Sequence, residues 1–217
     1  MATAVHTPKK SERSKKPTNE PACNIALLYP RQSLWTEAQY LEQEAISGNW
    51  MIELVNGRLE FPTMPNLVHQ DIVKFLLFRL DDFVLAHCKG EVSHAPLPVR
   101  LGKDRYREPD IVFFKPHRIK DKRKPPEGAD LVLEVVSPGK EARKRDLEDK
   151  RADYAKAKIP EYWIVDPETK RITVLTLSGK TYKAHGVYKP GDQAASKLLK
   201  GFKVAVSDVF AAGEGKG

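Results

Sequence analysis

Residues 129–136 read ADLVLEVV, a segment of strand length that is largely apolar on both of its alternating faces. Segments of this kind are typical of a central strand that helices cover on both sides of a sheet. Glu134 interrupts the segment, and burying an unpaired carboxylate costs several kcal/mol or more. The Glu134 side chain is therefore expected to be ion-paired, neutralised or metal-bound. Its position alone leaves a structural salt bridge and a functional site equally open.

Two further apolar segments accompany this one. Residues 162–166 (YWIVD) predict a second buried strand, and residues 110–114 (DIVFF) predict a third that begins at Asp110. Pro109 precedes that strand, and proline is tolerated at the first position of a strand. A single acid at a strand end is usually just solvated. Two acids on neighbouring strands, Asp110 and Glu134, would instead form a site of hard oxygen ligands suited to Mg²⁺ or Mn²⁺.

A charged helix is predicted over residues 143–157, downstream of Glu134. At 100° per residue, one stripe of this helix holds six side chains: Arg143, Asp146, Leu147, Lys150, Tyr154 and Ala157. Nearly every other position is charged or alanine, so this stripe is the face that is able to dock on the sheet. The alternative is an exposed pair of Asp146 and Lys150 at i,i+4, which would leave the helix almost no buried face. We favour a functional polar stripe.

The remaining sequence predicts a mixed α/β fold in which helices flank the strands. Asn56-Gly57 supplies the positive φ angles of a type I′ turn and predicts an N-terminal hairpin of residues 50–55 and 58–61. Apolar residues recur at helical spacing between residues 66 and 87. The other predicted elements are a helix at 36–44 opened by a capping box, strands at 92–101 and 172–177, and short strands towards the C-terminus.

The composition is that of a globular protein, since 41% of the 217 residues are hydrophobic and 30% are charged. No apolar run approaches the roughly 18 residues of a membrane span, and the first residues hold no signal-peptide core. The two cysteines lack metal-ligand spacing, so we expect a cytoplasmic protein without a zinc site or a disulfide framework. The sequence also predicts a disordered basic tail at residues 1–24, a single domain at 25–212 and a flexible C-terminus at 213–217.

Positive charge is in excess, because 37 lysines and arginines against 29 acids give a formal net charge of +8. An excess of this size suits a polyanionic partner, although many basic proteins have none. Six of the cations crowd into residues 115–124: Lys115, Arg118, Lys120, Lys122, Arg123 and Lys124. For this segment a solvated loop is favoured over phosphate contacts.

Four motifs in this order carry a family resemblance: EPDIVFF at 108–114, LVLEVVSP at 131–138, RKRDLEDKRADYA at 143–155 and IPEYWIVDP at 159–167. Together they resemble the Uma-type restriction endonuclease family, within the PD-(D/E)XK nuclease superfamily. The hairpin WMIELVNGRLEF, the helix NLVHQDIVKFLLFRL and the C-terminal PGD…FKVAVSDVF are similar to the same family, so the resemblance covers about residues 30–212. It implies a restriction-endonuclease-like fold, in which helices flank a central mixed β-sheet.

The resemblance also implies a site. Asp110 matches the acid of the PD element, and Glu134 matches the acid that follows it. The superfamily usually has a lysine two residues after that acid, where this chain has Val136, and the resemblance implies that Lys150 on the next helix replaces it. Glu53 matches a further acid and is a candidate metal ligand, with an outward-facing strand residue as the equal alternative. Supporting roles are implied for His69, Arg143, Asp146 and Tyr154, although a histidine on an amphipathic helix is more often structural.

The implied function is the hydrolysis of nucleic-acid phosphodiester bonds, with DNA favoured, by a metal-dependent endonuclease. Asp110 and Glu134 would bind Mg²⁺ (or Mn²⁺), and Lys150 would orient the attacking water or stabilise the transition state. Because superfamily members often pair to cut two strands, the resemblance further implies a homodimer. Two alternatives stay open: a non-catalytic nucleic-acid-binding protein with the same fold, and a partner-binding protein whose charged helix is an interaction surface.

Overall fold

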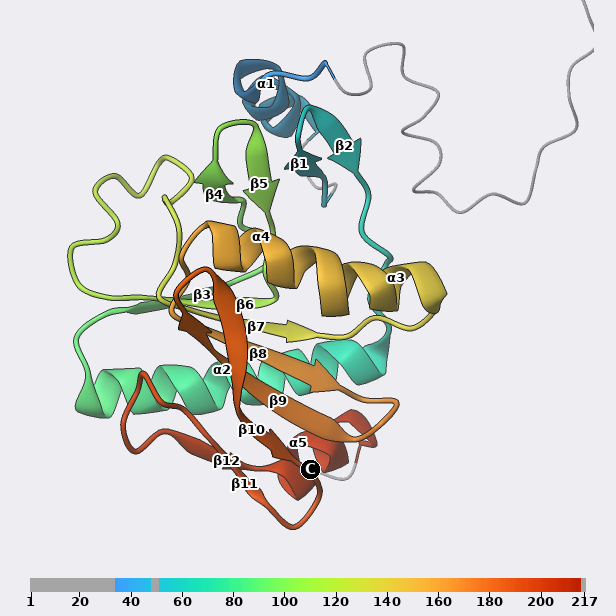
Figure 1. Ribbon diagram of the computed structural model, residues 1–217, viewed down its shortest axis with the longest axis vertical. Coiled ribbons are helices and arrows are strands. Elements are labelled where there is room, and N and C mark those ends of the chain that lie inside the picture. Colours follow the sequence, from blue (N-terminus) through green and yellow to red (C-terminus); the bar gives the residue numbers. More distant parts are fainter. Residues whose placement is uncertain (1–33, 48–50, 216–217) are drawn as a thin grey trace, which may run out of the picture.

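A six-stranded mixed β-sheet forms the centre of the protein in the computed structural model, which describes residues 34–47 and 51–215 (Figure 1). The strand order is β10-β9-β8-β7-β6-β3. Neighbouring strands run antiparallel except for the parallel pair β7 and β8. The strands are β3 (Glu91–His94), β6 (Ile111–Phe114), β7 (Leu131–Val135), β8 (Glu161–Asp166), β9 (Arg171–Ser178) and β10 (Thr181–Tyr188). The predicted central mixed sheet is confirmed, and the tail predicted at residues 1–24 lies outside the described residues.

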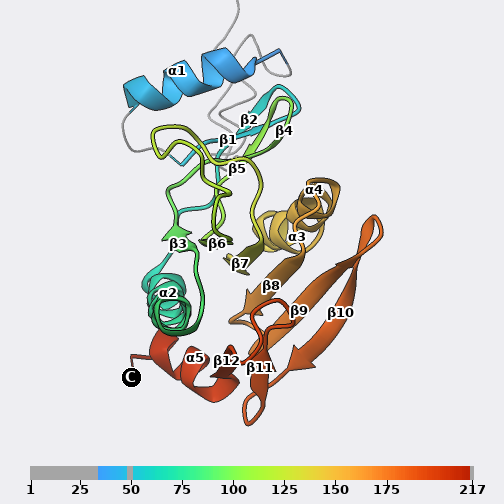
Figure 2. The same ribbon diagram turned by 90° about the vertical axis from the view of Figure 1, so that its left-hand side faces the viewer.

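Helices cover both faces of this sheet (Figures 1 and 2). One face packs against α2 (Leu67–His87), the hairpin β11 (Gln193–Ala195) and β12 (Lys203–Ala205), and α5 (Val206–Gly213). The opposite face packs against a helix in three parts: α3 (Lys140–Lys144), a π-helical turn η2 (Arg145–Asp149) and α4 (Lys150–Lys156). No helix within the described ranges is both long and apolar enough to cross a membrane.

The alternation of β7 explains where its acid points. Leu131, Leu133 and Val135 are buried with α2, whereas Val132 and Val136 are buried on the side of α4. Since successive side chains of a strand point to opposite faces, Glu134 shares the α4 face. The apolar run at 129–136 is therefore a strand covered on both faces, as predicted, and its carboxylate lies beneath the charged helix.

A smaller antiparallel sheet, in the order β2-β1-β5-β4, lies beside the large one and carries α1 (Glu37–Ser47) (Figure 2). Asn56 and Gly57 have φ angles of 53° and 75°, so the predicted type I′ hairpin is confirmed. The capping box is confirmed as well, because Thr36 and Gln39 exchange hydrogen bonds between side chain and backbone. The strands of this sheet are β1 (Glu53–Val55), β2 (Arg58–Glu60), β4 (Val99–Gly102) and β5 (Arg105–Arg107).

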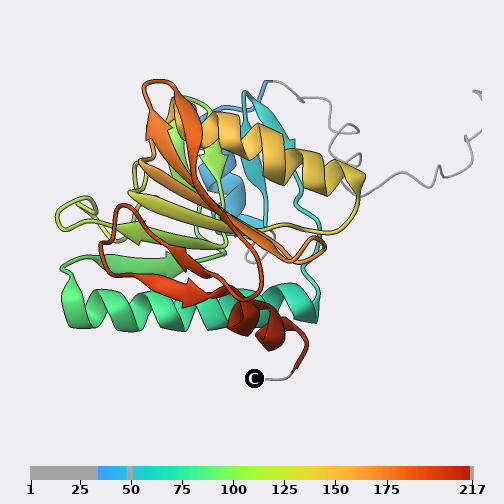
Figure 3. The ribbon, with the colours of Figure 1, turned by 60° about the horizontal axis from the view of Figure 1, so that its bottom comes forward.

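The structure corrects three of the predicted elements. The strand predicted at 92–101 is two strands in different sheets, β3 and β4, because Pro96 and Pro98 lack the N–H groups that a continuous ladder needs. The charged helix starts at Lys140 rather than at 143 and contains the π-helical turn. The third correction is α5, a helix that was not predicted and that follows the predicted short strands β11 and β12. It packs on α2, with the Gly213 backbone against Ile72 (Figure 3).

Gly90, directly before β3, provides a first test of the fold. A Cβ atom there would lie 2.5 Å from Phe113 Cε2 and 2.6 Å from the Phe114 carbonyl oxygen, at a φ of 155°. Overpacking of a well-packed core costs up to about 3 kcal/mol. We expect Gly90→Ala to lower the free energy of unfolding by about that amount, measured by urea denaturation. Gly102→Ala is the matched control, because Gly102 has a φ of 154° with open space around it, and equal losses in the two variants would contradict the packing.

Candidate active site

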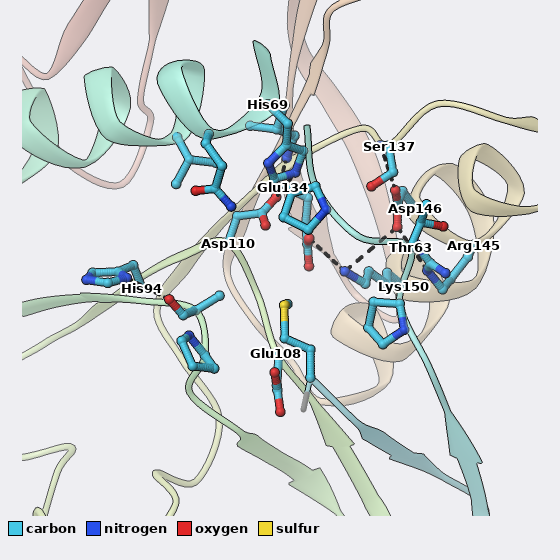
Figure 4. Close-up of a pocket in the computed structure, with 18 residues that line it drawn as sticks. Thr63, His69, His94, Glu108, Asp110, Glu134, Ser137, Arg145, Asp146 and Lys150 are labelled. Carbon is cyan, nitrogen blue, oxygen red and sulfur yellow. Dashed lines mark hydrogen bonds and ion pairs between the residues drawn. The ribbon is translucent and has the colours of Figure 1, made fainter. Parts of the chain in front are cut away.

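An ion pair between β7 and α4 forms the centre of the candidate site (Figure 4). Lys150 Nζ lies 2.7 Å from Glu134 Oε2, and the Tyr154 hydroxyl donates a short hydrogen bond to Glu134 Oε1. The three residues are 5%, 2% and 0% exposed. Val136 is buried in the apolar core between β7 and the helix, so the helix supplies the cation that this strand position lacks. The buried carboxylate of Glu134 is thus paired, as its position in an apolar strand required.

Further acids lie around this pair. Burial raises the pKa of Glu134; Lys150, its ion-pair partner, opposes this shift, whereas the carboxylates of Asp110 and Asp146 act in the same direction as burial. Burial also disfavours the charged form of Lys150, but the surrounding acids outweigh it and raise its pKa. Arg145 contacts Asp146 and Arg107 contacts Glu53, so Lys150 and His69 are left beside the carboxylates of Glu134 and Asp110. A cation added beside these two acids would be stabilised.

Asp110 lies next to this pair because β6 and β7 are neighbours in the sheet. Its Oδ2 accepts a hydrogen bond of 2.7 Å from the Val135 N–H and lies 3.3 Å from His69 Nε2. His69 belongs to the first turn of α2, where its own N–H donates to the capping side chain of Asn66 at 2.9 Å. Burial opposes protonation of His69, but its contact with Asp110 outweighs burial and raises the His69 pKa. Two acids and a histidine thus converge from three separate elements.

Asp146 joins the site from the π-helical turn. Its Oδ2 accepts from the Ser137 N–H at 3.0 Å, and its Oδ1 lies 3.8 Å from Lys150 Nζ and 3.2 Å from Arg145 Nε. The Tyr162 hydroxyl donates to the Asp146 carbonyl at 2.9 Å, inside this turn. Turns of this kind occur frequently at functional sites. The predicted polar stripe of the helix is therefore buried against the sheet at Asp146, Lys150 and Tyr154.

Glu53 is fully buried, so the alternative of an outward-facing strand residue is wrong. Its Oε2 lies 2.6 Å from the Arg107 guanidinium, while its Oε1 accepts from the Glu108 N–H at 2.9 Å and lies 3.9 Å from Lys150 Nζ. Burial is the largest influence on its pKa and would raise it, but Arg107 and Lys150 outweigh burial and lower the pKa to about 2. Glu53 is thus a charged neighbour of Lys150 whose oxygens already accept other hydrogen bonds.

The structure does not bring Arg143 into this cluster. Its guanidinium donates to both carboxylate oxygens of Asp166, at 2.9 and 2.7 Å, and lies 2.9 Å from Glu168. These partners lie at and just beyond the end of β8, and Arg143 does not line the cavity described below. It ties α3 to the sheet.

Two buried residues near the site were not predicted. Arg107, which is 1% exposed, pairs with Glu53, Glu60 and Asp153, and each of these partners is at least 46 residues away in sequence. No local pattern indicates pairs at such separations. Glu108 is 2% exposed and borders the cavity. Its place two residues before Asp110, in the same EPD motif, was a usable signal.

A cavity of about 140 Å³ opens beside these groups. Its polar lining includes His69, Glu108, Asp110, Glu134, Asp146 and Lys150 (Figure 4). Among the residues that the structure describes, no three His, Cys, Asp or Glu side chains already surround a common point as a metal site. Asp110 and Glu134 nevertheless both face this cavity with carboxylate oxygens, the donors that Mg²⁺ and Mn²⁺ prefer. This donor set fits a divalent cation.

Comparisons with known proteins agree with this fold. A model of the Uma2 family, described as "Putative restriction endonuclease", matches residues 37–207. A solved structure from Anabaena variabilis, described as a "putative nuclease belonging to DUF820", superposes with a TM-score of 0.67 at 17% identity and covers 82% of this chain and 98% of that one. No curated protein sequence matched significantly. The structural likeness shows a restriction-endonuclease-like fold, and because the family match spans most of the sequence, this chain belongs to the Uma2 family.

Proposed function

We propose that this protein is a divalent-metal-dependent endonuclease that hydrolyses phosphodiester bonds, with DNA as its substrate. One observation carries the proposal: the carboxylates of Asp110 and Glu134, from adjacent strands, share a cavity with the ammonium group of Lys150. Family membership supports a nuclease activity. The metal and the choice of DNA go beyond the family and are part of the proposal.

Each of these three residues would have a separate role in the reaction. Asp110 and Glu134 would hold Mg²⁺ or Mn²⁺, which when bound lowers the pKa of a water molecule and polarises the phosphate. The Val135 N–H fixes one oxygen of Asp110 and leaves the other for this task. Lys150 would orient the attacking water or stabilise the negative charge that develops on the phosphate oxygens.

The neighbouring groups would act by positioning these three. Tyr154 holds one oxygen of Glu134, and His69 lies against the carboxylate of Asp110. Asp146 and Glu53 surround the ammonium group of Lys150 at 3.8 and 3.9 Å and favour its charged form. Glu53 would therefore place the lysine instead of binding the metal.

The proposal is tested by removing the metal. With supercoiled plasmid, we expect nicking and linearisation by the wild-type protein in millimolar Mg²⁺ or Mn²⁺ and none in EDTA. In the same ions the melting temperature should rise, because a ligand bound by the folded state alone stabilises it, by about 2.7 kcal/mol at a hundredfold excess over Kd. Cleavage that persists in EDTA would contradict the metal requirement.

A second function is favoured by the ion pair itself. The ammonium group of Lys150 is paired with the carboxylate of Glu134, which a metal ion would need as a ligand. This arrangement suits a non-catalytic protein that binds nucleic acid on the same fold. The assay separates the two, because such a protein would retain plasmid in a gel shift but would neither cut it nor be stabilised by Mg²⁺. Wild-type protein that binds DNA and behaves in this way would overturn the nuclease proposal in favour of the binding protein.

A further inference from the structure

A second hollow lies along a different face of α4 from the candidate active site. This groove, of about 590 Å³, runs between α4 and the turn that joins β9 to β10, two elements that Figure 2 shows side by side. Lys150 lines the active-site cavity, whereas the next residue, Arg151, lines the groove. Consecutive helical residues point about 100° apart, so the helix forms one wall of each hollow.

The groove is strongly basic, and we call it the basic groove. Four exposed cations line it, Arg151, Lys156, Lys158 and Lys180, against the single acid Glu148. Within the described part of the chain, none of these four cations lies within 4.0 Å of a carboxylate oxygen. The hydrogen bond found for Arg151 is a donation to the carbonyl of Tyr182 at 3.1 Å. Four cations against one acid leave the groove with an excess of positive charge.

The loop at 115–124 contrasts with the basic groove, although it is the most basic stretch of the sequence. Arg118 lies 2.6 Å from Asp130, and Lys122 lies 2.6 Å from Glu91. Lys124 is also within 4.0 Å of Asp121. Much of the loop's charge is thus neutralised locally, which agrees with a solvated loop.

The walls of the basic groove also suit a backbone of repeated phosphates. Ala152, Ala155, Gly179 and Thr181 are small, so a bulky chain can approach α4 and the turn closely. The cations are spread along an open groove at the ends of long, flexible side chains, which favours an extended polyanion over one small anion held by fixed donors. The groove and the active-site cavity share α4, and they are lined by consecutive residues of it, Arg151 and Lys150.

We propose that the basic groove binds the phosphodiester backbone of the nucleic acid that the active site cuts, as a contact separate from the catalytic cavity. This inference rests on the proposed nuclease function for the identity of the polyanion. It assigns substrate affinity to Arg151, Lys156, Lys158 and Lys180, and the chemical step to the cavity on a different face of the helix.

The test compares two variants of the full chain with equal loss of charge. The groove variant carries Arg151→Gln, Lys156→Gln, Lys158→Gln and Lys180→Gln. The loop variant carries Lys120→Gln, Lys122→Gln, Arg123→Gln and Lys124→Gln. Binding of a fluorescein-labelled 30-base-pair DNA duplex is measured by anisotropy in EDTA at several salt concentrations, so that cleavage plays no part. Plasmid cleavage is then measured in Mg²⁺.

We expect the groove variant to bind at least about tenfold more weakly in 0.1 M salt. The magnitude of the slope of log K against log salt should fall by about 3.6, since four phosphate contacts are lost. In cleavage the groove variant should raise KM and leave kcat unchanged, while the loop variant changes affinity by less than about threefold. Equal losses in the two variants would show that net charge alone matters and would overturn the inference.

The two proposals fail separately. If the wild type cleaves DNA and the groove variant has the same KM, the basic groove is not a substrate contact, whereas the nuclease proposal stands. If the groove variant binds DNA more weakly but the wild type does not cleave it, the basic groove is a nucleic-acid contact and the nuclease proposal is wrong.

Discussion

Glu134→Gln is expected to slow metal-dependent plasmid cleavage by at least about a thousandfold, equivalent to about 4 kcal/mol of transition-state stabilisation. The amide still accepts the hydrogen bond from Tyr154, but it loses the charge that would hold the cation and pair with Lys150. Initial nicking rates at saturating DNA and millimolar Mg²⁺ measure the effect. A loss of less than about tenfold would remove Glu134 from the catalytic machinery.

The chain offers a matched control in Glu161→Gln. Glu161 is 1% exposed and lies on β8, next to β7, but Trp163 and Ser196 bind its carboxylate away from the cavity. This variant should lower stability and leave kcat unchanged. If both variants lost cleavage equally, the cause would be unfolding, which circular dichroism would reveal.

The variant Lys150→Met completes this test by distinguishing the role of the helix lysine in cleavage from metal binding by the two acids. Removing the ammonium leaves Asp110 and Glu134 in place, so we expect metal-induced thermal stabilisation to remain while cleavage falls by about a hundredfold or more. Cleavage that survives in Lys150→Met but not in Glu134→Gln would keep the metal site and contradict the role of the helix.

Arg107→Met should cause the largest loss of stability, about 3–5 kcal/mol. The Arg107 guanidinium is 1% exposed and joins Glu53 on β1 to Asp153 on α4, with contacts of 2.6 to 2.9 Å. Without it, two buried carboxylates lose the cation that they share, although Asp153 keeps its ion pair with Arg105 and Glu53 keeps Lys150 at 3.9 Å. The free energy of unfolding in urea, followed by tryptophan fluorescence, measures the loss. Arg107→Lys should recover only part of it, because an ammonium group cannot bind two acids through a planar fork.

Glu60→Gln provides the control for this stability test. Glu60 contacts the same guanidinium at 2.7 Å, but its side chain is 36% exposed. Ion pairs of exposed groups contribute about 1 kcal/mol or less, so this substitution should cost little. Similar losses in Arg107→Met and Glu60→Gln would contradict the view that burial makes this network important.

The centre of the fold was predictable because the order of apolar, polar and turn residues within a single segment favours one type of element there. An apolar run predicted β7, helical spacing predicted α2, and Asn56-Gly57 predicted the hairpin. The stripe on the charged helix even indicated the face that docks, because its other faces had no apolar residues to bury.

The misses arise where partners distant in sequence decide the structure. The predicted strand at 92–101 is an exception, because Pro96 and Pro98, which separate β3 from β4, are visible in the sequence. The network of Arg107 and the basic groove join residues from separate segments, and no window of sequence contains them. The helix α5 was a different kind of miss, since Val206, Val209 and Phe210 already had helical spacing.

The π-helical turn at Arg145–Asp149 amounts to one extra residue inserted into an otherwise regular helix. If the same residues formed a regular α-helix instead, every side chain after the turn would rotate by about 100° around the axis. Lys150 and Tyr154 would then leave Glu134 together, although neither had been substituted. The meeting of a helix lysine with a strand acid 16 residues earlier therefore depends on the wider turn as strictly as on residue type. Substitutions that favour a regular α-helix at this turn, while conserving every candidate catalytic residue, would be as damaging as replacing one.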